Sequence, residues 1–121
     1  MSAAVAPAPD RPSRRILVTG AAGDIGAKVC RHLEAAGRFE LVRLDLAPGG
    51  DPGIARADLA TAELGWTDLF AGVDTVIHLA ARVRAYGGWG DMVGPNVDAL
   101  LTVYLAAQRR GVRRVIFASS V

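Results

Sequence analysis

Three glycines near the start of the chain have a spacing that suits the binding of phosphate groups. Gly20, Gly23 and Gly26 follow an apolar run that ends at Thr19, and a stretch with helical periodicity comes next. In such a strand–turn–helix the first glycine permits a tight turn, the second lets a pyrophosphate approach the main chain, and the third lets the helix pack on the strand. Main-chain N–H groups and the helix dipole then attract the phosphates. The loop residues that we expect to contact a dinucleotide are Gly20, Ala22, Gly23, Asp24, Ile25 and Gly26.

An acidic residue stands where a dinucleotide would place its adenosine ribose. Asp45 ends the second apolar run, 22 residues after Gly23. A carboxylate at this position accepts hydrogen bonds from the ribose hydroxyls and disfavours a 2′-phosphate, so the pattern favours NAD over NADP. The alternative is that the glycines only form turns and that Asp45 is a solvated strand end.

Two further segments are candidates for cofactor contact, and each has a structural alternative. Asp58 and Leu59 follow a short third apolar run and can contact adenine, the aspartate by hydrogen bonding and the leucine by packing. A polar loop end explains them equally well. Leu79, Ala80 and Ala81 end the fourth run. Small residues there suit a main chain that runs along a bound cofactor, and they also suit tight sheet packing.

Apolar runs alternate with helical patterns along the chain. Such runs are typical of strands buried on both faces, and the alternation predicts an α/β fold with a parallel sheet and right-handed crossovers. We expect strands at 15–20, 39–45, 54–57, 74–79 and 115–119. We expect helices at 25–36, at 61–73 with Thr61 as N-cap, and at 91–110. Residues 1–13, rich in Ala and Pro, are expected to form a flexible tail, and residues 14–121 one domain.

Apolar residues at helical spacing predict which face of each helix is buried. His78, inside the fourth strand, is expected to be a hydrogen-bonded core residue. The helix residues expected to be buried are Ile25, Val29, Leu33 and Ala36, then Trp66, Leu69, Phe70 and Val73, and finally Val93, Val97, Leu100, Leu101 and Tyr104.

The composition excludes several classes of function. The formal net charge is +2 and the arginines are scattered along the 121 residues, so a nucleic-acid partner is not indicated. Cys30 is the single cysteine, which excludes an internal disulfide and fits a reducing cytoplasm. No run approaches the roughly 18 apolar residues of a membrane span. Cys30 and His32 would point in different directions from one helix, so no metal site is predicted.

Five stretches together resemble the extended short-chain dehydrogenase/reductase family, also called the NAD-dependent epimerase/dehydratase family. They occur in the family's order and span nearly all of the chain after residue 14. The matching stretches are 16–26, 58–59, 76–81, 95–98 and 111–120. The resemblance implies a Rossmann-type doubly wound sheet with strand order 3-2-1-4-5, NAD as cofactor, and a sugar or similar hydroxylated substrate. Within the family the chain is most similar to uronate dehydrogenases.

The resemblance also implies roles for polar residues beyond the glycine loop. Ser120 matches a serine that hydrogen-bonds the reacting substrate oxygen, and Asn96 matches a residue that holds the site's geometry beside the cofactor. Ser120 as a turn cap and Asn96 as a cap of the long helix are the alternatives. Residues 82–84 stand where uronate dehydrogenases place a substrate contact. Tyr86 and Trp89 can wall the pocket, and Trp89 can equally anchor the long helix by packing.

The catalytic base that the resemblance implies is not in this sequence. Family members use a Tyr-x-x-x-Lys, in which the lysine and the cofactor's charge lower the pKa of the tyrosine so that it can exchange the hydroxyl proton. The tyrosines here are Tyr86 and Tyr104, and the single lysine is Lys28. We therefore expect a truncated, inactive, NAD-binding portion of an oxidoreductase, epimerase or dehydratase. The alternative is a non-catalytic dinucleotide-binding sensor or regulatory module.

Two expectations about assembly follow. A sheet truncated after the fifth strand would leave apolar side chains in water, so the isolated chain is expected to be poorly stable or to aggregate. The resemblance implies that the 91–110 helix can form a homodimer interface.

Overall fold

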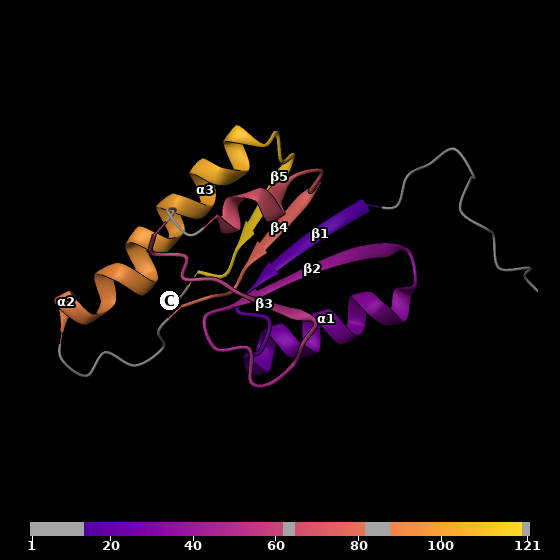
Figure 1. The fold of residues 1–121 in the computed structure, drawn as a ribbon, viewed down its shortest axis with the longest axis horizontal. Helices are drawn as coiled ribbons and strands as arrows, with labels where there is room; N and C mark the ends of the chain where they lie inside the picture. Colours follow the sequence, from indigo (N-terminus) through magenta and orange to yellow (C-terminus); the bar gives the residue numbers. More distant parts are fainter. Residues whose placement is uncertain (1–13, 62–64, 82–87, 120–121) are drawn as a thin grey trace, which may run out of the picture.

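Five parallel strands form the centre of the molecule (Figure 1). The structure, a computed structural model, describes residues 14–61, 65–81 and 88–119. The sheet order is β3-β2-β1-β4-β5, which confirms the predicted α/β class and strand order. Strand ends differ from the sequence-based expectation by at most two residues, and the expected tail at 1–13 lies outside the described residues. The strands are β1 (Arg14–Thr19), β2 (Phe39–Asp45), β3 (Ile54–Arg56), β4 (Thr75–His78) and β5 (Arg114–Phe117).

Helices cover both faces of this sheet. Helix α1 (Asp24–Ala36) lies along one face, and η2 (Trp66–Phe70) and α3 (Ala99–Arg109) lie along the other (Figure 1). Successive side chains of a strand point to opposite faces, so each strand contributes to two cores. The core on the α1 side contains Ile16, Val18, Ala21, Cys30 and Ile54. The larger core contains Leu17, Leu44, Ala57, Leu59, Trp66, Phe70, Val73, Val76, Ala99, Val103, Ala106 and Ala107.

Apart from Thr61, the predicted second helix is described only from residue 65 onward. In that part of the range 61–73, the structure has one short 3₁₀ helix, η2, and residues 62–64 lie outside the described residues. Gly65 is the N-cap of η2 and has φ 76°, a left-handed conformation. The carbonyl of Thr61, the residue expected as N-cap, accepts a hydrogen bond from Trp66 Nε1 at 2.6 Å.

The predicted long helix is present but irregular. It consists of α2 (Trp89–Met92), a π-helical segment η3 (Val93–Asp98) and α3. Pro95 explains the wide segment, because proline has no N–H to donate and its ring clashes with the carbonyl four residues earlier. Gly111 ends the helix with φ 70°, as expected.

The buried face of the long helix differs from the prediction. Leu101, Tyr104 and Leu105 are 57%, 42% and 50% exposed. The helix is apolar on most sides, so periodicity did not specify its inner face. Small residues let the helix approach the sheet closely. Of the residues predicted to be buried, Val93 and Leu100 are half-buried, whereas Val97, Leu101 and Tyr104 are exposed. The buried α3 residues are Ala99, Val103, Ala106 and Ala107.

The other predicted helix faces are correct in part. Trp66, Phe70 and Val73 are buried, whereas Leu69 is partly exposed. In α1, Val29 and Leu33 are half-buried, and Ala36 is exposed. Ile25 is 64% exposed because the first turn of α1 lies beyond the end of β1, where no strand remains to cover it. On the edge strand β5, Ile116 and Phe117 are 47% and 43% exposed, as expected for strand residues without a covering layer.

Candidate cofactor-binding site

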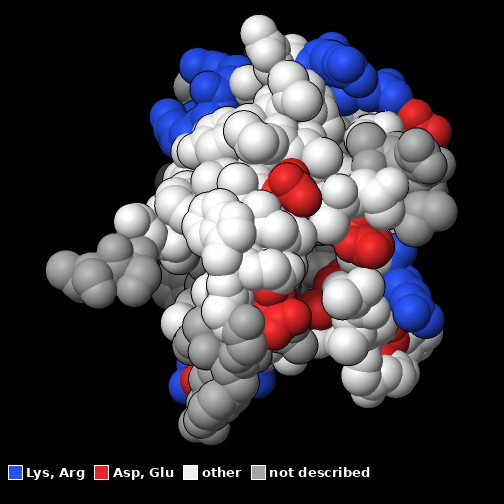
Figure 2. All heavy atoms as spheres, turned by 90° about the vertical axis from the view of Figure 1, so that its left-hand side faces the viewer, with Lys and Arg blue, Asp and Glu red and all other residues white. Residues whose placement is uncertain are grey.

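The connections from β1 and β4 leave the sheet toward opposite faces. The chain passes from β1 to α1 on one side, and from β4 to the α2–η3–α3 helix on the other. Neighbouring parallel strands with this property form a topological switch point, and ligands of open α/β sheets bind there, beyond the carboxyl ends of the strands. Asp and Glu side chains gather near the middle of this edge, and Lys and Arg side chains lie around its margin (Figure 2). A ligand at this edge therefore meets an acidic surface.

Two glycines of the loop are required by the fold. Gly20 has φ 68°, and a Cβ built on it would lie 2.8 Å from Ala80 N at the end of β4. A Cβ on Gly26 would overlap the carbonyl of Gly20. Both contacts are with main chain, which cannot swing away, so larger residues would separate α1 and β4 from β1.

Gly23 is different, because the protein alone does not demand glycine there. Its φ of −70° and ψ of 170° are open to any residue. A Cβ would meet Gly20 O at 3.3 Å, which a shift of a few tenths of an ångström relieves. What a Cβ at Gly23 would obstruct is the space outside the loop.

The first turn of α1 presents N–H groups to that space. Gly23 is the N-cap and supplies no side-chain acceptor. The amides of Asp24, Ile25 and Gly26 precede the first N–H of the helical ladder, which Ala27 donates to Gly23 O at 2.8 Å. The carboxylate of Asp24 forms an exposed ion pair with Lys28, 3.3 Å away, and the amide of Asp24 faces the same end of the helix as those of Ile25 and Gly26.

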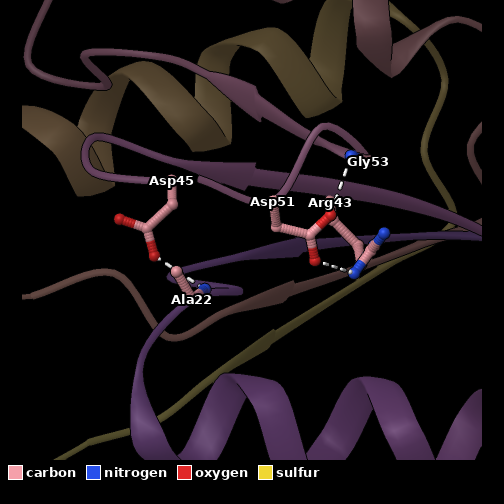
Figure 3. A network of polar contacts seen from close by, with 5 residues as sticks. All are labelled: Ala22, Arg43, Asp45, Asp51 and Gly53. Carbon is pink, nitrogen blue, oxygen red and sulfur yellow. Dashed lines mark hydrogen bonds and ion pairs between the residues drawn. The ribbon is translucent and has the colours of Figure 1, made fainter. Parts of the chain in front are cut away.

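Asp45 lies against the glycine loop. Its Oδ2 accepts a hydrogen bond from Ala22 N at 2.8 Å (Figure 3). Its Oδ1 accepts a second one from Ala47 N at 3.0 Å. Each carboxylate oxygen has a second lone pair, and the residue is only half-buried, so two further donors can approach. The structure thus brings the predicted acid and the predicted loop together.

The turn after Asp45 is closed by an ion pair. Asp51 accepts a hydrogen bond from Gly53 N at 2.8 Å and pairs with Arg43 at 3.0 Å (Figure 3). A cavity of about 300 Å³ lies between this turn and α1, beside Ala22 and Cys30. Burial raises the pKa of the Cys30 thiol. The cavity lies beside the glycine loop, on the α1 face of β2 and not at the switch point.

A buried network that sequence reasoning missed fixes the ends of β1 and β4. Thr19 Oγ1 accepts hydrogen bonds from Leu79 N and Ala80 N, each at 3.1 Å. Its own hydrogen then points to His78 Nδ1, 2.7 Å away. His78 is 2% exposed and stacks on Phe117, which confirms the predicted core histidine. Burial lowers the pKa of His78, in agreement with a neutral ring that accepts at Nδ1.

The predicted cofactor residues after β3 and β4 differ from one another in burial. Asp58 is half-buried, and its Oδ1 accepts a hydrogen bond from Ala60 N at 3.1 Å. The Leu59 side chain is 6% exposed and belongs to the large core, so adenine contact would fall to Asp58. Ala80 packs closely against Gly20, which supports the tight-packing interpretation, while Ala81 is exposed.

The long helix carries two further candidates. Asn96 is half-buried in η3, and its Nδ2 donates to Met92 Sδ at 3.7 Å. It is not the cap of the long helix, which begins after Gly88. Trp89 is 72% exposed, so the packing-anchor interpretation is wrong. Ser120, Tyr86 and residues 82–84 lie outside the described residues.

Within residues 14–61, 65–81 and 88–119, no group of three or more His, Cys, Asp or Glu side chains could hold a metal ion. In the same ranges no helix is long and apolar enough to cross a membrane.

Comparisons with known proteins show the family of the chain. The model of the NAD dependent epimerase/dehydratase family matches residues 16–121. A uronate dehydrogenase of Pseudomonas putida is 37% identical over 115 residues, covering 90% of this chain and 41% of the relative. A short-chain dehydrogenase/reductase superfamily protein from Agrobacterium tumefaciens, solved with bound NAD, has a TM-score of 0.78 and 36% identity, covering 88% of this chain and 33% of that one.

A sugar-nucleotide complex is also similar. MoeE5, solved with UDP-glucuronic acid and NAD, has a TM-score of 0.77 and 35% identity, covering 88% of this chain and 36% of that one. The chain therefore spans about two fifths or less of the length of these relatives. Because the family model covers nearly every residue from β1 onward, the chain belongs to the NAD-dependent epimerase/dehydratase family.

Proposed function

We propose that this chain is the NAD-binding portion of an NAD-dependent oxidoreductase, epimerase or dehydratase that acts on a sugar or similar hydroxylated compound. The observation that carries the proposal is the 2.8 Å hydrogen bond between Ala22 N and Asp45. It brings the carboxylate at the end of β2 to the glycine loop and the first turn of α1. One small region then offers N–H donors to a diphosphate and a carboxylate to a ribose diol, which a dinucleotide carries side by side.

Each part of the cofactor has residues suited to hold it. The unpaired amides at the start of α1 suit the diphosphate, and the absence of a Cβ on Gly23 lets it approach. Asp45 suits the adenosine ribose and Asp58 the adenine. Beyond the switch point, Ala80, Ala81 and Asn96 border the nicotinamide side. When bound, NAD supplies a hydride acceptor or donor.

The charge of the site favours NAD over NADP. Asp45 stands where a 2′-phosphate would lie, and acidic side chains gather on the surrounding face (Figure 2). A second phosphate would add negative charge against both. The attraction for NAD comes from the main-chain dipoles at the start of α1, which act at short range on the diphosphate and not on a phosphate at the ribose.

The whole protein's chemistry needs groups beyond those described. Similarity to uronate dehydrogenase and to a protein solved with UDP-glucuronic acid supports a sugar substrate. We assign Ser120 to the reacting substrate oxygen. Residues 1–121 contain no Tyr-x-x-x-Lys, and we place the proton-exchanging base outside them, so that this portion is inactive by itself.

Assembly and location form part of the proposal. Leu101, Tyr104 and Leu105 give α3 an exposed apolar face that fits a homodimer through the 91–110 helix. Cys30 is buried and unpaired, which fits the reducing cytoplasm.

A second function that the same dinucleotide site would serve is that of a non-catalytic dinucleotide-binding sensor or regulatory module. The gene sequence that follows codon 121 separates the two. A Tyr-x-x-x-Lys encoded there favours the enzyme, and its absence favours the module.

Calorimetric titration with NAD and NADP tests the shared core of both functions. Wild-type protein should bind NAD and discriminate against NADP. In Asp45→Ala the affinity for NAD should fall roughly tenfold, because hydrogen bonds to a charged group contribute about 1.5 kcal/mol or more. Asp45→Asn, which keeps an acceptor without the charge, should lose the discrimination in particular. Equal affinity of wild type for both cofactors would contradict the proposed selectivity, and no binding of NAD would refute the function.

A further inference from the structure

The hydroxyl of Thr102 reaches from α3 to the loop that follows β3. Thr102 Oγ1 donates to the carbonyl of Leu59, a residue 43 positions away in sequence. The same hydroxyl lies 3.0 Å from Ala99 O. A helical carbonyl already receives the N–H four residues later, and threonine has only one hydroxyl hydrogen. We therefore assign that hydrogen to Leu59 O.

The loop that Thr102 contacts runs past the adenosine end of the cofactor site. It begins at Ala57, whose N–H donates to the main-chain oxygen of Asp45 at 3.0 Å. The next residue is Asp58, which forms a compact turn. Its carboxylate accepts from Ala60 N at 3.1 Å, and its carbonyl accepts from Thr61 N at 3.2 Å. The orientation of the Asp58 carboxylate thus depends on where the loop is held.

Two side chains from the opposite layer hold this loop. Trp66 Nε1 donates to Thr61 O, and Thr102 Oγ1 donates to Leu59 O. The first comes from η2 and the second from α3, so both anchors lie on the side of the sheet away from α1. The Thr102 anchor is one residue from Asp58. Among the residues described, no donor contacts Asp58 Oδ2, which leaves that oxygen available to a ligand.

We propose that Thr102 is a positioning residue for the adenine end of the cofactor: through Leu59 it fixes Asp58 where its carboxylate can meet the adenine. This inference rests on the proposed function. The proposed role makes α3 part of the adenosine site, although α3 follows β4 in the chain and the adenosine site lies at the ends of β2 and β3. It also explains a polar residue among the apolar positions of that helix.

Three variants test the inference. Thr102→Val removes the donor and keeps the β-branched shape, whereas Thr102→Ser keeps the hydroxyl. Thr67→Val is the matched control, because Thr67 lines the same small hollow between η2 and α3 without an assigned bond to the loop. Affinities for NAD and for AMP are measured by calorimetry. We expect Thr102→Val to bind both about five- to tenfold more weakly, and the other two variants to stay within about twofold of wild type.

Hydrogen exchange separates positioning from general stability. In ligand-free Thr102→Val the amides of Ala60 and Thr61 should exchange faster, while amides in β1 and β4 keep wild-type rates. A purely structural role would lower the melting temperature and leave AMP affinity unchanged, and that result would overturn the inference. If wild type binds no NAD, the proposed function fails. In that case unchanged exchange at Ala60 would overturn the inference separately, and faster exchange would support the anchoring of the loop.

Discussion

Replacing Gly23 by alanine separates what the fold requires from what a ligand requires. The new Cβ would lie 3.3 Å from Gly20 O, so the loop must give by only a few tenths of an ångström. Alanine is a poorer N-cap than glycine by about 0.5–1.5 kcal/mol, and it restricts the unfolded chain by about 0.4–1 kcal/mol in the opposite sense. The free energy of unfolding should therefore change by no more than about 1 kcal/mol.

Binding of NAD should respond far more strongly to the same change. The methyl group would occupy the space in front of the first amides of α1, where we place the diphosphate. Loss of one hydrogen bond between an amide and a charged phosphate costs about 1.5–3 kcal/mol, which is roughly a 10- to 100-fold increase in Kd. The assay is calorimetric titration with NAD, together with thermal unfolding followed by circular dichroism.

Two other glycines provide controls. Gly90→Ala adds a methyl group in α2 with no atom within 4 Å and should leave both stability and affinity near wild type. Gly26→Ala puts its Cβ into the carbonyl of Gly20 and within 3.0 Å of Ala21 Cα, so it should destabilise the fold by about 3 kcal/mol or more. If Gly23→Ala folded normally and bound NAD as tightly as wild type, the diphosphate could not lie where we place it.

Two further predictions concern stability and assembly. Burial lowers the pKa of His78 below its unfolded value of 6.5, so the unfolded chain binds more protons near that pH. Stability should therefore be complete above about pH 6.5 and fall as the pH drops through the folded pKa. His78→Asn keeps an acceptor for Thr19 and should flatten this dependence in denaturant titrations from pH 7 to 5; an unchanged slope would contradict the assignment. Leu101→Glu on the exposed face of α3 should convert a dimer to a monomer in light scattering, with Gln108→Glu as the control on the same helix, and a monomeric wild type would refute the dimer.

The strands were predictable because their signals are local. Ile16, Leu17 and Val18 form an apolar run that belongs in a strand buried on both faces, and all three are indeed buried. Gly20 and Gly26 were also read correctly, since strand–turn–helix packing leaves few residue types that fit. In each of these cases the residue's own size or shape decides the structure.

The buried face of the long helix was predicted less well, because the sheet that packs against the helix decides which of its faces is buried. Leu101 and Tyr104 have the larger side chains, and burial by size alone favours them. Ala106 and Ala107 are buried instead, and their small side chains let the helix axis approach the sheet. The gain comes from close packing along the helix, which hydrophobic periodicity does not measure.

The partners in the hydrogen bonds that shape the site were not predictable, although a hydrogen bond of His78 was expected. Thr19 and His78 are 59 positions apart, and Thr102 and Leu59 are 43 apart. In each pair a threonine looks, in sequence, like an ordinary β-branched residue. Only a polar side chain at a position that should be fully buried gives a hint, as Thr19 does at the end of β1. Such a residue must find a partner, but the sequence does not say which one.

These buried hydrogen bonds explain how a site with an acidic surface could still hold the diphosphate of a dinucleotide, which carries two negative charges. Charged side chains attract phosphate over long range, whereas main-chain N–H groups act only at contact distance and in one direction. A site built from amides therefore depends on exact placement of its main chain. The hydrogen bonds of Thr19 hold the ends of β1 and β4 together, and the carboxylate of Asp45 holds the amide of Ala22. Gly20 packs so closely against Ala80 that β1 and β4 have no space to move apart or together at this point. In the arrangement that we propose, the amides lie nearer to the diphosphate than the carboxylates do and hold it against their repulsion, whereas an added 2′-phosphate would meet the carboxylates without such amides.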